Sequence, residues 1–152
     1  QALELYQQAL SMLRELGNRA GEAATLNNMA GVYSDTGNPR QALELYQQAL
    51  PLMRELGNRA GEAATLNNMG EVYRTTGNPR QALELYQQAL PITKEVGERT
   101  GEAATLGNMA NVYSDTGNPR QALELYQQAL LLHRKVGDQA GEATTLNNIG
   151  EV

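Results

Sequence analysis

The chain has 152 residues and carries 12 Lys and Arg against 17 Asp and Glu, a net charge of −5. This balance lacks the basic footprint of proteins that bind nucleic acid, and the apolar runs are far shorter than the ~20 residues of a membrane-spanning helix. There is no Cys, which excludes a disulfide framework or a thiolate metal site and favours a reducing compartment such as the cytoplasm.

The dominant feature of the sequence is an internal repeat. The segment Gln-Ala-Leu-Glu-Leu-Tyr-Gln-Gln-Ala-Leu begins at Gln1, Gln41, Gln81 and Gln121, and residues 1–40 and 41–80 are identical at 33 of 40 positions. Such a period is typical of arrays in which each unit packs on its neighbours. We therefore predict a single array over residues 1–152, with units at 1–40, 41–80, 81–120 and 121–152. The first helix, at residues 1–16, lacks the helix that should precede it, and the last unit is incomplete. Because the array thus starts and ends inside a repeat, we expect a piece of a longer protein.

The same signals divide each unit into two helices. Gly17 and Gly37 stand where a glycine tolerates the left-handed conformation that ends a helix, and Asn18 and Asn38 follow as side-chain caps of the next helix. Pro39 occupies a first helical position, where its missing N–H costs nothing. Eight helices are predicted, in chain order, at residues 1–16, 19–36, 39–56, 59–76, 79–96, 99–116, 119–136 and 139–152.

Apolar residues at steps of three and four agree with these helices, since Ala42, Tyr46 and Ala49 share one helix face. Tight turns make consecutive helices antiparallel, and small residues such as Gly70 let their axes approach closely. Pro51, inside a predicted helix, predicts a local kink. The Glu and Arg residues of each unit are interpreted as solvated faces.

Residues from Leu66 to Ala89 carry a resemblance to a known family. Leu66, Met69-Gly70, Tyr73, Gly77, Ala82, Tyr86 and Ala89 stand at the offsets of the tetratricopeptide repeat signature, which recurs in register along the chain. The unit is six residues longer than the usual 34 and lacks the closing Pro. In this it is similar to the repeats of Partner of Inscuteable and of tandem arrays in bacterial signalling proteins.

The resemblance implies an all-α fold, a right-handed solenoid of stacked antiparallel helical hairpins. It also implies that the first helix of each pair lines a concave face, which binds an extended peptide or a partner helix of another protein. The candidate contacts are residues that vary between units on this face, together with an Asn that is constant. They are Asn27, Asn28, Gly31, Ser34, Asn67, Asn68, Glu71, Arg74, Asn108, Asn111, Ser114, Asn147, Asn148 and Glu151.

No catalytic or cofactor-binding motif is present. His133 is the only His, at a position that is mostly apolar in other units, and this indicates a packed side chain. No cluster of ligands predicts a metal site, and the glycines mark helix ends without forming a phosphate-binding loop. The leading hypothesis is therefore a protein-binding scaffold and not an enzyme.

Other interpretations remain open at this point. The array could be a structural spacer, a designed consensus sequence or, remotely, a catalytic unit. It could also assemble with copies of itself, because residues 1–16 and 140–152 would expose surfaces that are buried elsewhere in the array. Such a head-to-tail contact would propagate as an open superhelix.

Overall fold

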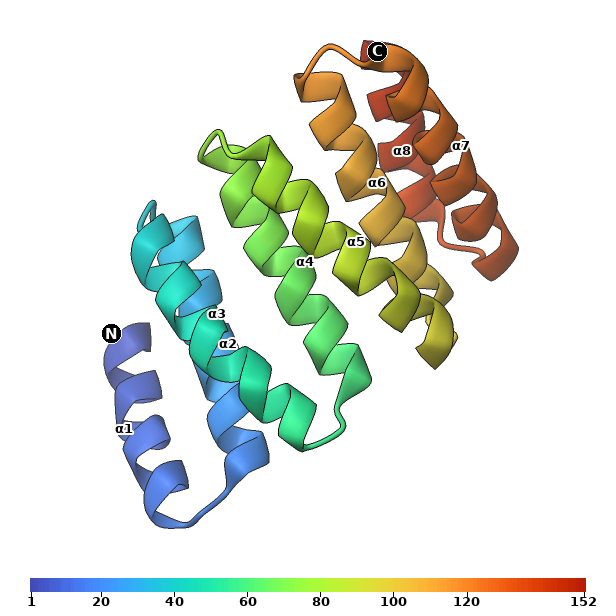
Figure 1. Ribbon diagram of the computed structural model, residues 1–152. Coiled ribbons are helices and arrows are strands. Elements are labelled where there is room, and N and C mark those ends of the chain that lie inside the picture. Colours follow the sequence, from blue (N-terminus) through green and yellow to red (C-terminus); the bar gives the residue numbers. More distant parts are fainter.

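The computed structural model describes all 152 residues, and it contains helices without any strand. The helices are α1 (Ala2–Glu15), α2 (Arg19–Asp35), α3 (Pro39–Glu55), α4 (Arg59–Thr75), α5 (Pro79–Val96), α6 (Arg99–Asp115), α7 (Pro119–Val136) and α8 (Gln139–Glu151). Every boundary lies within one residue of the predicted one. Antiparallel helices succeed one another along the stack, with the termini at opposite ends (Figure 1). The predicted all-α solenoid is thus confirmed.

Glycine ends every helix that is followed by a turn. Gly17, Gly37 and Gly57 have φ of +66°, +75° and +64°, and no residue other than Gly has a positive φ. This conformation is strained for residues with a Cβ, which explains why each turn carries a glycine. The side chain of Asn18 then caps α2, since its Oδ1 accepts a hydrogen bond from the Gly21 N–H at 2.9 Å.

The predicted capping role is wrong at the turns that contain proline. Asn38 accepts no capping hydrogen bond; its Nδ2 turns back and donates to the Thr36 carbonyl at 3.0 Å, and Asn78 and Asn118 do the same with Thr76 and Thr116. Proline at the first helical position leaves one N–H fewer to satisfy, whereas the end of the preceding helix has carbonyls without partners. These amides therefore stabilise the preceding helix. Glu98 also makes no side-chain cap.

The helices α3 and α5 remain α-helical through Pro51 and Pro91. Proline at these positions is exposed, so the lost hydrogen bond lies on the solvent side of the helix. The kink expected there stays a prediction.

Small residues and tyrosines form the core between neighbouring helices. Ala30 is buried together with Ala42, Tyr46 and Met69 of the next unit, and equivalent clusters recur along the stack. Gly70 allows a close approach of α4 and α5, since a methyl group there would lie 2.5 Å from Cε1 of Tyr86. The core is thus a series of local contacts between adjacent units, as expected of a solenoid.

The interpretation of every Glu as solvated is wrong for Glu22 and Glu62, which are 7% and 4% exposed. Arg54 approaches Glu62 from the end of the preceding helix at 2.7 Å, and Arg59 approaches it from the same helix. Burial raises the pKa of Glu62, but the hydrogen bonds from the two arginines outweigh it and hold the pKa below its ordinary value.

Arg59 and its equivalent Arg19 also join successive helices. Arg19 pairs with Glu55 of α3 at 3.2 Å, and Arg59 pairs with Glu95 of α5 at 2.8 Å. The corresponding residue of α7 is Lys135, and Arg99 forms no ion pair with that helix. The ladder of ion pairs therefore stops before the last unit.

The packing also shows which helices lie inside the curve of the stack. Helices α2, α4, α6 and α8 each contact the next of their kind, whereas α1, α3, α5 and α7 do not. Equivalent elements lie closer together on the concave side of a curved stack. We call the first set the inner helices and the second set the outer helices.

Candidate peptide-binding face

The fourteen candidate residues all lie on the inner helices. This placement brings residues 40 apart in the sequence into one row, although their individual environments differ. Some bridge neighbouring units, some line hollows and some are free. A role in binding stays a prediction for all of them.

Asn27 and Asn67 bridge neighbouring units. Asn27 Nδ2 donates to Thr65 Oγ1 at 2.9 Å, and Asn67 Nδ2 donates to Thr105 Oγ1 at the same distance. Both threonines are fully buried. These amides therefore fasten α2 to α4 and α4 to α6, a role that sequence reasoning missed. The available signal was a Thr at the same place in every unit.

The constant Asn row is more open. Asn28 and Asn68 are exposed, whereas Asn108 and Asn148 are half-buried. Asn28 and Asn108 make no side-chain hydrogen bond within the chain, so their donors and acceptors are available to a ligand. Asn148 differs, because its Nδ2 donates to Asn111 Oδ1 at 3.3 Å.

A charged network lies at the centre of the face. Arg74 donates to both oxygens of Glu71, at 2.7 and 3.0 Å, and to Asp115 of the next unit at 2.6 Å. The hydrogen bonds that Arg74 donates to Glu71 and Asp115 raise the pKa of Arg74, against the effect of burial. Since two carboxylates share one guanidinium, the network carries a net negative charge.

Buried tyrosines reach this network from the outer helices. Tyr86 donates its hydroxyl to Glu71 Oε2 at 3.3 Å, and Tyr126 donates to Asn111 Oδ1 at 2.5 Å. Burial raises the pKa of both tyrosines, and nearby carboxylates add to the effect. The rings of Tyr86 and Tyr126 are core residues, as predicted. Their hydroxyl groups, however, form hydrogen bonds with residues of the inner helices.

Five of the candidate residues surround one hollow of about 240 Å³. The residues that line it are Arg74, Asn111, Ser114, Asp115, Tyr126, Asn148 and Glu151. It lies between α4, α6 and α8, with amides, two hydroxyl groups, one guanidinium and carboxylates at its wall. The hollow can therefore donate hydrogen bonds to a peptide backbone and attract a positive charge.

Other candidates lie apart from this hollow. Ser34 is half-buried and Asn147 is exposed, and neither side chain makes a hydrogen bond within the chain. Gly31 leaves space beside the Tyr46 hydroxyl, which would lie 4.0 Å from an added methyl group. Two residues outside the candidate set, Asp115 and Tyr126, complete the hollow.

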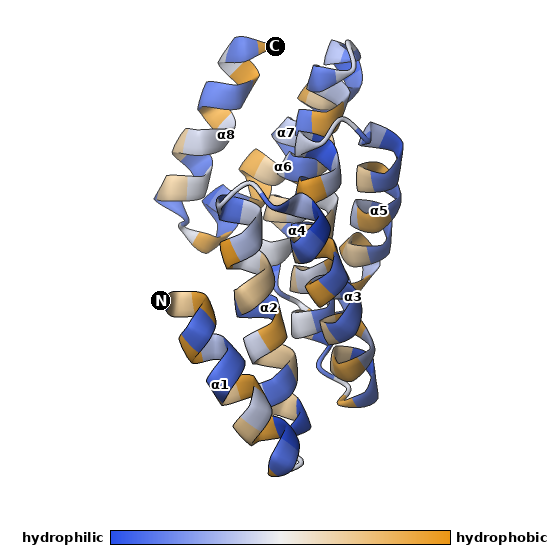
Figure 2. Cartoon of the chain, turned by 90° about the vertical axis from the view of Figure 1, so that its left-hand side faces the viewer, coloured by the Kyte–Doolittle hydropathy of each residue, from blue (hydrophilic) through white to orange (hydrophobic).

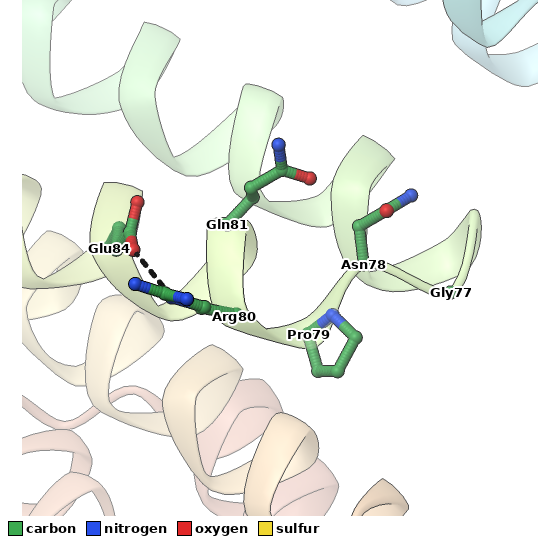
Figure 3. A pocket seen from close by; sticks show the side chains of 6 residues that line it. All are labelled: Gly77, Asn78, Pro79, Arg80, Gln81 and Glu84. Carbon is green, nitrogen blue, oxygen red and sulfur yellow. Dashed lines mark hydrogen bonds and ion pairs between the residues drawn. The ribbon is translucent and has the colours of Figure 1, made fainter.

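Other recesses of the surface occur at the turns and not on the inner face. One of about 460 Å³ is formed by Gly77 to Gln81 with Glu84, and Arg80 in it pairs with Glu84 at 3.2 Å (Figure 3). The same recess recurs at Gly37 and Gly117. These recesses are shallow consequences of the turn, and their ionised side chains are solvated.

His133 is packed, as its position predicts. It is 7% exposed, and its Nδ1 lies 2.8 Å from Oδ2 of Asp138. The other oxygen of Asp138 caps α8 by accepting from the Gly141 N–H at 3.0 Å. That bond lowers the pKa of Asp138, and the hydrogen bond to His133 lowers it further. The pair thus stabilises the start of α8.

Two further properties bear on function. No group of three or more His, Cys, Asp or Glu side chains is placed to hold a metal ion. Among the eight helices, none combines the length and the apolar character needed to cross a membrane.

Comparison with known proteins agrees with this architecture. The tetratricopeptide repeat model matches residues 1–55, 21–95 and 101–152. The chain belongs to the tetratricopeptide repeat family. Members of this family are generally protein–protein interaction modules and are typically non-catalytic. No curated protein matches the sequence.

Solved structures share the fold at low sequence identity. BtubC (BKLC) from P. vanneervenii is 23% identical with a TM-score of 0.81, and the match covers 97% of this chain and 62% of that protein. The nearly identical TPR-like repeats from Podosopora anserina are 18% identical, with a TM-score of 0.75 and coverage of 97% and 74%. The TPR domain of Arabidopsis FLU is 20% identical, with a TM-score of 0.71 and coverage of 77% and 98%. This chain thus spans less than two thirds of BtubC.

Proposed function

We propose that this chain binds an extended peptide or a partner helix of another protein along the inner helices. The observation that carries the proposal is the row of amides on this face, in which Asn28 and Asn108 have no partner within the chain. An amide offers two donors and one acceptor, which suits the N–H and C=O groups of an extended backbone. The hollow between α4, α6 and α8 provides a place for a side chain of the ligand.

The charge on this face favours a ligand with basic residues. Asp35 and Asp115 are exposed, and Glu151 lines the central hollow. The single arginine of the face, Arg74, is already paired with Glu71 and Asp115. The attraction should weaken as salt is added, because the Debye length is only ~8 Å at physiological ionic strength.

Replacing Asn28, Asn68 and Asn108 together with Ala tests the proposal. The probe is a peptide selected from a random library on the immobilised wild-type chain. We expect its affinity, measured by calorimetry, to fall at least about tenfold, since each net hydrogen bond contributes roughly 1 kcal/mol. The circular dichroism spectrum should remain that of the wild type.

A matched control changes the same number of amides on the outer helices. Gln48, Gln88 and Gln128 are exposed, and their replacement with Ala should leave the affinity unchanged. If the two triple variants bind the selected peptide equally well, or if selection yields no peptide with saturable binding, the inner face is not the binding site.

The second candidate function is head-to-tail assembly, in which α8 of one copy packs against α1 of the next. Leu146 is 45% exposed, whereas Leu26, Leu66 and Leu106 at the same place are at most 3% exposed. Leu5 on α1 is 63% exposed. Figure 2 shows hydrophobic residues on both of these helices, at the two ends of the stack. The two surfaces are complementary because the array repeats, and a stable contact would bury more than ~1,000 Å².

We expect assembly to make the sedimentation coefficient of the wild-type chain rise with concentration, and Leu146→Glu to abolish the rise. Thr75→Ala, on an exposed part of α4, serves as the control and should assemble like the wild type. If the wild-type chain sediments as a monomer at all concentrations, head-to-tail assembly is wrong. The array would then be a binding module or a spacer without a ligand.

A further inference from the structure

A second hollow, of about 250 Å³, lies beside Gly107 between α6 and α8. Its lining residues are Ala103, Ala104, Gly107, Asn108, Asn111, His133, Gly141, Thr144, Thr145 and Asn148. Gly107 stands where Asn27 and Asn67 stand in the preceding units. Nothing lies within 4 Å of a methyl group added at Gly107. The hollow is therefore the space that an Asn side chain would occupy.

The missing side chain leaves a buried acceptor without its partner. Thr65, Thr105 and Thr145 all donate the hydroxyl to the carbonyl of the residue four positions earlier, at 2.8 Å. Thr65 and Thr105 in addition accept a hydrogen bond from an Asn amide. A hydroxyl has two acceptor lone pairs, and at Thr145 no group of the chain uses them.

The exposure of the three threonines agrees with this vacancy. Thr65 and Thr105 are 0% exposed, whereas Thr145 is 5% exposed. That value is close to the 8% of Thr25, which like Thr145 accepts no hydrogen bond from an amide of this chain. Gly107 leaves Thr145 open on the side where Asn27 and Asn67 cover Thr65 and Thr105.

The lining selects the chemistry of an occupant. Asn108, Asn111 and Asn148 supply neutral donors and acceptors, and no Asp, Glu, Lys or Arg lines the hollow. His133 also lines it, but its Nδ1 is already paired with Asp138 at 2.8 Å. A charged group would lose its hydration there without gaining a counter-charge. A carboxamide matches the site, because its N–H group can reproduce the bond that Asn67 makes to Thr105 in the neighbouring unit.

We propose that the hollow beside Gly107 binds the carboxamide side chain of an Asn or Gln in the ligand. The inference rests on the proposed peptide binding along the inner helices and adds to it a specificity-determining site in the third unit. One side chain of the ligand would thus occupy the place of the Asn side chain that this unit lacks, while the constant Asn row binds the ligand backbone.

The chain supplies a matched pair of variants for the test. Gly107→Asn fills the hollow with the side chain found in the other units, and Asn67→Gly opens an equivalent hollow at Thr105. Both changes copy a residue that the array already tolerates at that position, so the fold should persist. The probe is acetamide, titrated into the ¹⁵N-labelled chain and followed by the amide resonances of residues 107, 145 and 105.

We expect saturable shifts at residues 107 and 145 in the wild-type chain. Gly107→Asn should raise the dissociation constant at least tenfold, and Asn67→Gly should create a second saturable site at residue 105. Acetate, which has a similar shape but no N–H and a negative charge, should bind at least tenfold more weakly than acetamide. Shifts without saturation, shifts unchanged by Gly107→Asn, or equal binding of acetate would each overturn the proposal.

A parallel selection of peptides separates this proposal from the proposed function. Peptides selected on the wild-type chain should be enriched in Asn or Gln at one position, and those selected on Gly107→Asn should lose that enrichment. If peptides bind but show no such preference, the carboxamide site fails while peptide binding stands. If acetamide binds and no peptide does, the hollow is real and the peptide-binding function fails.

Discussion

Replacing Gly70 with Leu is expected to destabilise the array by about 3 kcal/mol, the upper end of what overpacking typically costs. A methyl group at this position would already lie 2.5 to 2.9 Å from three atoms of the Tyr86 ring. A leucine adds three further carbons to a contact between α4 and α5 in which Tyr86 is fully buried. The two helices must separate to make room for it. Chemical denaturation followed by circular dichroism measures the loss.

Two controls make the prediction specific to packing. Gly70→Ala should cost much less than Gly70→Leu. The Tyr86 ring must shift to admit the methyl group, but Ala30 and Ala110 are buried beside Tyr46 and Tyr126 at the same place, and Ala favours a helix by up to ~1 kcal/mol. Thr75→Ala, on the exposed face, should also change stability little. A Leu variant that unfolds at the same denaturant concentration as Thr75→Ala would show that the helix faces are wrongly assigned.

Tyr86→Ala should destabilise the chain still more, by ~3–5 kcal/mol, which is typical when a buried aromatic ring is removed. The ring is fully buried between α4 and α6, in a cluster with Ala82, Met109 and Val112. Tyr6→Ala removes the equivalent ring from α1, where it is only half-buried, and should cost clearly less. Equal unfolding free energies for the two variants would mean that the tyrosine ring contributes as much to stability at the end of the stack as at its centre.

The same tyrosine gives the array a sensitivity to alkali. Burial raises the pKa of Tyr86 in the folded chain above the value near 10 of an unfolded one. Above that pH the unfolded chain loses a proton that the folded chain keeps, so stability is complete below pH ~10 and falls as pH rises further. Tyr86→Phe should reduce this slope in denaturation curves measured across that range.

The helices and their ends could be predicted from the sequence because the signals are local. Gly followed by Asn, Asp or Glu, with Pro in alternate turns, marks each boundary, and small residues at the steps of a helix mark the packed face. Side-chain caps were predicted at every Asn that follows a glycine, but such an Asn can bond either to the start of the next helix or to the end of the preceding one. Asn18 caps the next helix, whereas Asn38 bonds to the preceding one.

Contacts between units were harder to predict. Arg74 and Asp115 are 41 residues apart in the sequence, and helix spacing gives the face of each residue but not its neighbour on the next helix. The buried Glu62 was missed because a carboxylate at a helix start is ordinarily solvated. A signal did exist, since an Arg or Lys stands eight residues before this Glu in every unit, as at Arg54.

Two substitutions in the second half of the chain, Gly107 and Lys135, have a mechanical consequence. Lys135 removes the ion pair that joins the earlier pairs of helices, and Gly107 removes the amide bond between neighbouring inner helices. In an array whose units contact only their neighbours, the weakest interface divides the chain into separately melting parts. We expect the amides of α7 and α8 to exchange their hydrogens sooner than those of α3 to α5. The solenoid would then behave as a stiff rod with a compliant last segment, able to change its pitch at one end while the remaining units hold their shape.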